Sequence, residues 1–224
     1  IARIARGNGH TKVLCQIDNV EPHEHHLTDK PFNRYYLHSV DGFVYMSEQV
    51  HSELRAYSDA PALFSPHPLF ENFGERVERS EACVRLGLDP ANRYVLFFGL
   101  IRDYKGLDLL LDAWAQLRRA GRTEGRRLIV AGEFYPAREP YLNRIADNGL
   151  QDEVLLHDRF IPDDDVKYYF SAADFVVQPY KTATQSGVTQ IAYNFELPMI
   201  VTDVGGLPEI VPDGRVGYVC RPDA

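Results

Sequence analysis

The chain has 224 residues, of which 45% are hydrophobic and 25% are charged, and its formal net charge is −8, a composition typical of one large or two small globular domains. The negative charge argues against a nucleic-acid partner, because a phosphate backbone would be repelled, and no apolar run approaches the ~20 residues of a membrane helix or follows the pattern of a signal peptide. The three cysteines, Cys15, Cys83 and Cys220, form neither a CxxC pair nor an even disulfide set, so we expect buried thiols in a reducing cytoplasm.

The first part of the chain carries strand and helix patterns ahead of a proline-rich segment. The strand patterns lie at 12–17 and 42–45, and the helix patterns at 32–38 and 47–57. Ser47 is the expected N-cap of the second helix. Three prolines indicate that 61–71 is a connecting segment. A short helix is predicted next at 80–86, with Ser80 as its N-cap and Gly87 just past its end.

A more regular alternation of strand and helix patterns follows. The strand patterns are near-continuous apolar runs at 94–98, 127–131, 153–156, 174–178, 198–202 and 217–220. The helix patterns lie at 106–119, 138–148, 164–173, 186–195 and 206–211. Buried strands that alternate with amphipathic helices predict an α/β fold with a Rossmann-like, doubly wound parallel sheet. Such sheets bind nucleotide-type ligands at the carboxyl ends of their strands.

Residues 95–106 indicate an anion-binding turn. A strand ends at Gly99, two cations follow at Arg102 and Lys105, and Gly106 opens an amphipathic helix. A helix start offers unpaired N–H groups and partial positive charge to a phosphate, and the cations add to that charge. A plain βα turn with solvated surface cations is the alternative for this stretch.

Two later turns have a similar character. Ser186 begins the helix 186–195 after a hydroxyl-rich loop, so we expect the N–H groups of residues 187–189 to be unpaired and to bind an anion. The alternative is that Ser186 only caps the helix, and Ser186 could cap the helix while the N–H groups bind an anion. Further on, Gly205 and Gly206 follow a strand, where paired glycines let the backbone approach a ligand closely.

Two polar clusters have the composition of metal sites. His23, His25 and His26 lie close together, but no second ligand group stands at a matching spacing, so we expect no metal there. The acidic run 163–165 directly precedes an amphipathic helix, where carboxylates complement the helix dipole. We therefore predict a site without a metal.

Four stretches taken in order resemble the C-terminal, donor-binding domain of the retaining GT-B nucleotide-sugar glycosyltransferases of family 4, often called group 1. They are FFGLIRDYKGLDLLLDAW, LIVAGEF, FSAADFVVQPYK and ELPMIVTDVGGLPEIVPDGRVGYV. Residues 12–68 look like the end of that family's N-terminal domain. The resemblance thus implies a partial acceptor-side domain with its linker at 1–75 and a donor-binding domain at 76–224, both Rossmann-like. Because the sequence begins at Ile1 and no helix pattern follows its last strand, we expect a piece of a longer protein that is inactive alone.

The resemblance also implies a function and its residues. The expected reaction is transfer of a hexosyl group from a nucleoside-diphosphate sugar to a sugar, lipid or polysaccharide acceptor, with retention and without a metal or other cofactor. The expected location is cytoplasmic, with peripheral membrane contact left open. Asp18 and His23 are the catalytic candidates on the acceptor side. The implied donor contacts are Gly99, Arg102, Lys105, Glu133, Phe160, Ser186, Gly187, Val188, Thr189, Gln190, Gly205 and Gly206.

The sequence departs from the family pattern in two places. Leu100 stands where the family usually has an arginine, and Arg102 follows two residues later. Ala183 and Ile191 align with two glutamates that normally lie by the donor sugar and on the ribose hydroxyls. We expect uncharged groups such as Gln190 to form those hydrogen bonds instead. The departures favour one alternative, a non-catalytic nucleotide-sugar-binding module; a GT-B phosphorylase or epimerase relative is the other.

Overall fold

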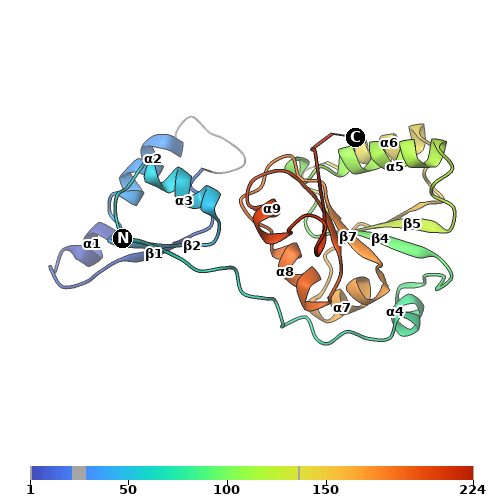
Figure 1. The fold of residues 1–224 in the computed structure, drawn as a ribbon, viewed down its shortest axis with the longest axis horizontal. Helices are drawn as coiled ribbons and strands as arrows, with labels where there is room; N and C mark the ends of the chain where they lie inside the picture. The colour runs from blue at the N-terminus through green and yellow to red at the C-terminus, as the bar shows by residue number, and fades with distance from the viewer. Residues whose placement is uncertain (1, 22–28, 136, 224) are drawn as a thin grey trace.

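The computed structural model describes residues 2–21, 29–135 and 137–223 (Figure 1). Within them the strands form two parallel sheets, ordered β1-β2-β3 and β6-β5-β4-β7-β8-β9. The first sheet consists of β1 (Leu14–Ile17), β2 (Gly42–Tyr45) and β3 (Ala62–Phe64). The second consists of β4 (Arg93–Phe98), β5 (Arg126–Ala131), β6 (Val154–His157), β7 (Phe175–Gln178), β8 (Met199–Thr202) and β9 (Gly217–Cys220).

The helices after β1 connect the strands in the predicted order, but the first helix, Ala2–Arg6, has no counterpart among the predicted elements. Those beside the small sheet are α1 (Ala2–Arg6), α2 (Asp29–Leu37) and α3 (Glu48–Arg55). Those beside the large sheet are α4 (Arg79–Leu86), α5 (Leu107–Arg119), α6 (Glu139–Asp147), α7 (Asp163–Ala172), α8 (Gly187–Asn194) and α9 (Leu207–Ile210), with a 3-10 turn at Asp103–Lys105 before α5. The predicted α/β class with parallel sheets is confirmed. We call the described residues of 2–64 the N-terminal lobe and those of 79–223 the C-terminal lobe; the domain bounds 1–75 and 76–224 stay predictions.

Three local expectations were wrong. The segment 61–71 contains β3, which pairs with β2 in parallel; a three-residue edge strand that directly follows Pro61 leaves too short a pattern to separate from a linker. Ser80 is not the N-cap of α4 but lies inside it, because the helix begins at Arg79, directly after Glu78. Of the three cysteines only Cys83 is buried; Cys15 is partly exposed and Cys220 is exposed.

The large sheet separates two apolar layers. Tyr94 and Leu96 of β4 face a cluster built with α4, α7 and α8, whereas Val95 and Phe97 face a cluster built with α5 and α6. Figure 1 shows these helices on opposite sides of the sheet. The central strands β4 and β5 are therefore buried on both faces over most of their length, as continuous apolar runs require. The small sheet has a core of its own, in which α3 packs through Val50 and Leu54.

The order of the large sheet reverses beside β4. The chain builds outward to β5 and β6 on one side of β4 and to β7, β8 and β9 on the other. A crevice forms at the carboxyl ends of the two strands that flank such a switch point. Gly99 follows β4 and Pro179 follows β7, so the turns that contain these two residues border this crevice.

Two glycines allow the turns at this edge to pack backbone against backbone. A Cβ on Gly106 (φ +68°) would lie 1.9 Å from the Pro179 carbonyl oxygen, and a Cβ on Gly132 would lie 2.1 Å from that of Gly99. Neither position has room for a side chain. The turn after β4 is thereby held against the end of β7.

Gly106→Ala is expected to destabilise the chain more than Gly121→Ala. Both glycines have φ +68°, but a Cβ on Gly121 would meet nothing within 4 Å. The control substitution should lower the free energy of unfolding by about 1–2 kcal/mol through its left-handed backbone alone, and Gly106→Ala should add the clash with Pro179. Urea denaturation of both variants measures the difference; equal losses would contradict the close approach.

Candidate functional site

Lys105 lies at the switch point without a counter-ion among the described residues. Its Nζ atom is 3.2 Å from the position of a Cβ on Gly99 and 5.8 Å from the ring centroid of Tyr180. Burial, together with the nearby Arg102 charge, lowers the pKa of Lys105 to about 8. Lys181, by contrast, is paired with Asp103 at 2.9 Å and Asp108 at 3.0 Å. Lys105 is thus the lysine at this edge whose charge is open to an anionic ligand.

The first turn of α8 lies against the same glycine. Val188 Cγ2 is 3.6 Å from the Cβ position of Gly99. The N–H groups of Gly187 and Val188 form no hydrogen bond within the part of the chain that the structure describes. Free N–H groups at a helix start carry partial positive charge. The structure therefore brings Gly99, Lys105 and the start of α8 together, as the sequence predicted.

Thr189 departs from that prediction. Its N–H is not unpaired but donates to the Ser186 carbonyl at 3.2 Å, as the tightened first turn of a helix allows. Its hydroxyl is buried against the Gln178 amide, 3.0 Å from Nε2 and 3.2 Å from Oε1. Thr189 thus anchors α8 to β7 and offers nothing to the crevice.

Ser186 stands before α8 in extended conformation, but its side chain forms no capping bond. Its hydroxyl lies 3.2 Å from the Tyr180 hydroxyl, and both residues are buried. Burial raises the pKa of Tyr180. Sequence reasoning missed Tyr180, whose ring lies near Lys105 Nζ and whose hydroxyl lies near that of Ser186. The available signal was its place in the turn that follows the strand β7.

Arg102 and Glu133 belong to the neighbouring turns of β4 and β5. The two turns are joined because Ile101 N–H donates to the Glu133 carbonyl at 2.8 Å and Tyr135 N–H donates to the Ile101 carbonyl at 2.9 Å. The Arg102 guanidinium lies 4.6 Å from the ring centroid of Tyr135. Glu133 itself is exposed. Both predicted residues are therefore at the carboxyl edge of the sheet, beside Gly99.

The turn after β6 holds Phe160, with 70% of its surface exposed. Before it, His157 Nδ1 lies 2.7 Å from the Tyr169 hydroxyl. Burial lowers the pKa of His157, and the Arg159 charge lowers it further, so this imidazole is neutral at pH 7. Phe160 shares the carboxyl edge of the sheet with Lys105, two strands away from β4.

The positions of the two missing glutamates face the core. Ala183 and Ile191 are 2% and 5% exposed and belong to the cluster beneath α8. Gln190, the expected substitute, is 4% exposed. At Gly205 a Cβ would lie 1.4 Å from the Ala183 carbonyl oxygen, so the two loops are in backbone contact. Gly205 and Gly206 thus line the loop that leads into α8.

Asp18 follows β1 and is exposed, and its neighbour Asn19 accepts a hydrogen bond through Oδ1 from the Thr184 hydroxyl. The acceptor-side candidate is therefore next to the loop before α8. His23 lies outside the described residues.

Gly187 is in contact with the segment between the lobes, because a Cβ there would lie 2.8 Å from the Phe70 ring.

The described residues contain neither a cluster of metal ligands nor a helix suited to span a membrane. No group of three or more His, Cys, Asp or Glu side chains there is placed to hold a metal ion. The acidic run forms the first turn of α7. In the same residues, no helix combines the length and the apolar character needed to span a bilayer.

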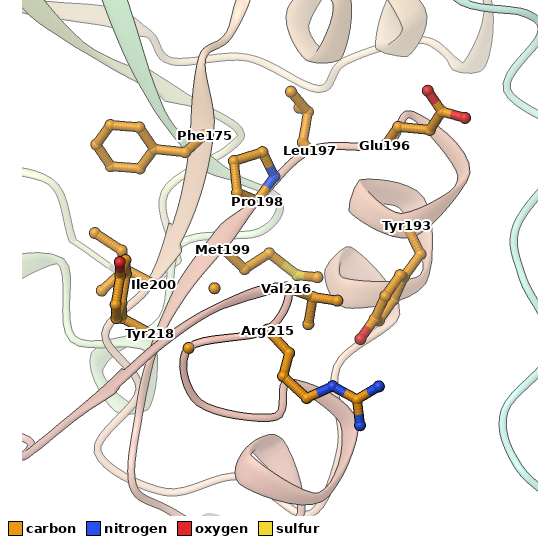
Figure 2. Close-up of a pocket in the computed structure, with 12 residues that line it drawn as sticks. Phe175, Tyr193, Glu196, Leu197, Pro198, Met199, Ile200, Arg215, Val216 and Tyr218 are labelled. Carbon is orange, nitrogen blue, oxygen red and sulfur yellow. The ribbon is translucent and has the colours of Figure 1, made fainter.

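A pocket of about 570 Å³ lies at the opposite edge of the large sheet (Figure 2). Its lining includes Phe175, Met199 and Gly217, which begin β7, β8 and β9. Figure 2 shows largely apolar side chains around it, with the charged ends of Glu196 and Arg215 at its border. Ligands of doubly wound sheets bind at the carboxyl edge, so this pocket is separate from the candidate site.

The chain is similar to known proteins in sequence and in structure. The chain is 31% identical over 172 residues to the lipopolysaccharide core biosynthesis mannosyltransferase LpsB of Rhizobium meliloti, which covers 71% of this chain and 45% of that protein. It superposes on sucrose-phosphate synthase of Thermosynechococcus elongatus with a TM-score of 0.82 at 20% identity, covering 98% of this chain and 57% of the other. Anabaena HepE in complex with UDP and glucose gives a TM-score of 0.75 at 18% identity, over 98% and 61%.

The chain spans about half the length of the curated relative that it matches, 45% of LpsB. The two structures share its fold. The family described as glycosyl transferases group 1 matches residues 92–224, which include the predicted donor contacts of the C-terminal lobe. The chain belongs to the glycosyl transferases group 1 family.

Proposed function

We propose that this chain holds the donor of a glycosyltransferase, a nucleoside-diphosphate sugar, and that the longer protein transfers the sugar to an acceptor. The observation that carries the proposal is the convergence of Lys105 Nζ, the bare backbone of Gly99 and the open N–H groups of α8 at the switch point. A half-buried cation beside a helix start suits a diphosphate, because both supply positive charge away from bulk water.

The diphosphate is also the leaving group of the proposed reaction. As the bond to the sugar breaks, negative charge grows on the phosphate oxygens, and Lys105, Arg102 and the N–H groups of Gly187 and Val188 are placed to stabilise it. A site of fixed cations and dipoles can do this without a metal, so metal independence is part of the proposal. Retention rests on the family resemblance, and the anomeric configuration of the product tests it.

The rest of the donor is assigned by position along the carboxyl edge. We place the base beside the turn that holds Phe160, and the sugar near Glu133 and the Gly205–Gly206 loop. Gln190 is the proposed hydrogen-bond partner of the ribose. The acceptor then approaches from the side of Asp18 and His23.

Two similar proteins support a hexose donor and a sugar-containing acceptor. HepE has been solved with UDP-glucose, and LpsB is a mannosyltransferase of lipopolysaccharide core biosynthesis. We propose that the reaction takes place in the cytoplasm. If the acceptor is a lipid, it takes place at the membrane surface.

The buried Ala183 and Ile191 favour a second candidate, a module that binds the nucleotide sugar without transferring it. One assay separates the two. The full-length protein is incubated with UDP-, GDP- and ADP-sugars, with and without EDTA, and release of nucleoside diphosphate is measured. Turnover that survives EDTA supports the metal-free transferase, turnover that EDTA abolishes removes metal independence, and saturable binding without turnover supports the module.

Lys105→Met should weaken binding of the preferred nucleotide sugar by about 1.5–3 kcal/mol, the usual contribution of a hydrogen bond to a charged group. Titration calorimetry on the 224-residue chain measures the change. Lys167→Ala is the control, because it removes one positive charge from α7, away from the switch point. Equal affinities of the wild type and the Lys105 variant would remove the assignment.

The same affinity should depend on pH in a defined direction. The pKa of Lys105 is about 8 in the free protein, and a bound diphosphate would raise it. Affinity should therefore be constant below pH 7 and fall above pH 8, by about tenfold per unit while only the bound form stays charged. In Lys105→Arg the charge persists, so the decline should disappear. A decline of the same size in both proteins would assign it to another group.

A further inference from the structure

The N-terminus of α3 is capped by a residue of the other lobe. Glu209 Oε2 accepts a hydrogen bond of 2.9 Å from the backbone N–H of Glu48, the first residue of α3, across 161 residues of sequence. Ser47 caps the same turn from within its own lobe, accepting from Val50 N–H at 3.4 Å. A carboxylate at this end of a helix is favourable because it satisfies a free N–H and opposes the helix dipole.

The backbone next to Glu209 packs against the same turn. A Cβ on Gly206 would lie 2.9 Å from Ser47 Cβ, and a Cβ on Gly205 would lie 2.6 Å from Gln49 Oε1. The loop before α9 therefore approaches α3 as closely as glycine allows. Figure 1 shows α9 on the side of the C-terminal lobe that faces α3.

A second hydrogen bond joins the lobes at the loop before α8. Thr184 donates from its hydroxyl to Asn19 Oδ1, at the carboxyl end of β1. The two contacts come from different parts of the C-terminal lobe, Glu209 in α9 and Thr184 in the loop before α8, and each reaches residues just past the carboxyl end of a strand in the small sheet. Both contacts therefore join the carboxyl edges of the two sheets.

We propose that Glu209 is a positioning residue that holds the two lobes in their facing arrangement by capping α3. It does so from the protein surface, since Glu209 is exposed, so the latch is weak enough to open and close. This contact biases the protein's own conformational equilibrium, whether or not a nucleotide sugar binds.

The sequence allows the donor and the acceptor of this bond to be removed separately. Glu209→Ala removes the carboxylate. Glu48→Pro removes the N–H at the first position of the helix, where proline is well tolerated, and Ser47 already has the extended backbone (φ −144°, ψ 149°) that a residue before proline adopts. Glu48→Ala removes only the side chain of Glu48 and is the matched control.

The readout is the distance between spin labels at Ser52→Cys on α3 and Gln116→Cys on α5, both exposed positions, with Cys15 and Cys220 replaced by serine. Pulsed electron paramagnetic resonance on the 224-residue chain gives the ratio of short to long distances. Glu209→Ala and Glu48→Pro should each lower this ratio by about two- to fivefold, the effect expected of a surface carboxylate at a helix start. Glu209→Gln, which still accepts a hydrogen bond, should lower it less.

The double variant decides the matter. If the two groups act through one bond, Glu48→Pro with Glu209→Ala lowers the ratio no further than either change alone, and Glu48→Ala leaves it unchanged. Two effects that add, or a distance distribution that Glu209→Ala does not alter, would overturn the proposal. Circular dichroism of each variant verifies that the helices are intact.

Discussion

The contact of bare backbone with bare backbone at the β4–β7 switch is the constraint on which the C-terminal lobe depends. Gly106 packs there on the Pro179 carbonyl, and Gly132, which follows β5, packs on the Gly99 carbonyl at the neighbouring turn after β4. Because no side chain separates these turns, the backbones of loops that follow neighbouring strands are in direct contact. That closeness places Lys105 beneath Tyr180 and next to the first turn of α8.

The electrostatics of the site follow from this placement. Lys181 and Lys105 are two lysines of the same edge, yet the first is neutralised by Asp103 and Asp108. The second is half-buried beside Gly99 and Arg102, and its pKa falls to about 8. A cation that loses water without gaining a carboxylate destabilises the folded state. A bound anion offsets that cost, which is why a partly desolvated lysine is a stronger indication of a ligand than a solvated one.

The departures from the family pattern also have a physical account. Ala183 and Ile191 are buried in the cluster under α8, where a glutamate would be an unpaired buried charge. Polar contacts in this region instead use a buried amide and hydroxyls, such as the Gln178–Thr189 and Tyr180–Ser186 pairs. These pairs attach α8 to β7, and the N–H groups of Gly187 and Val188 in its first turn remain without a hydrogen-bond partner among the described residues.

The sequence by itself determined the order of strands and helices, the parallel α/β class and the family. Runs such as 94–98 and 127–131, and the stripe of α5, carry that information locally. It also singled out Gly99, Lys105 and the start of α8 as candidates, because each stands in a turn after a strand or at the start of a helix. It missed β3, the pairing of the Thr189 N–H and the role of Tyr180. Only the tertiary structure decided these features. It also decided the cross-lobe contacts of Asn19 and Glu209 and which of the two lysines, Lys105 or Lys181, forms ion pairs. Each of these features joins residues that are distant in sequence, and local periodicity does not record which distant group becomes a neighbour.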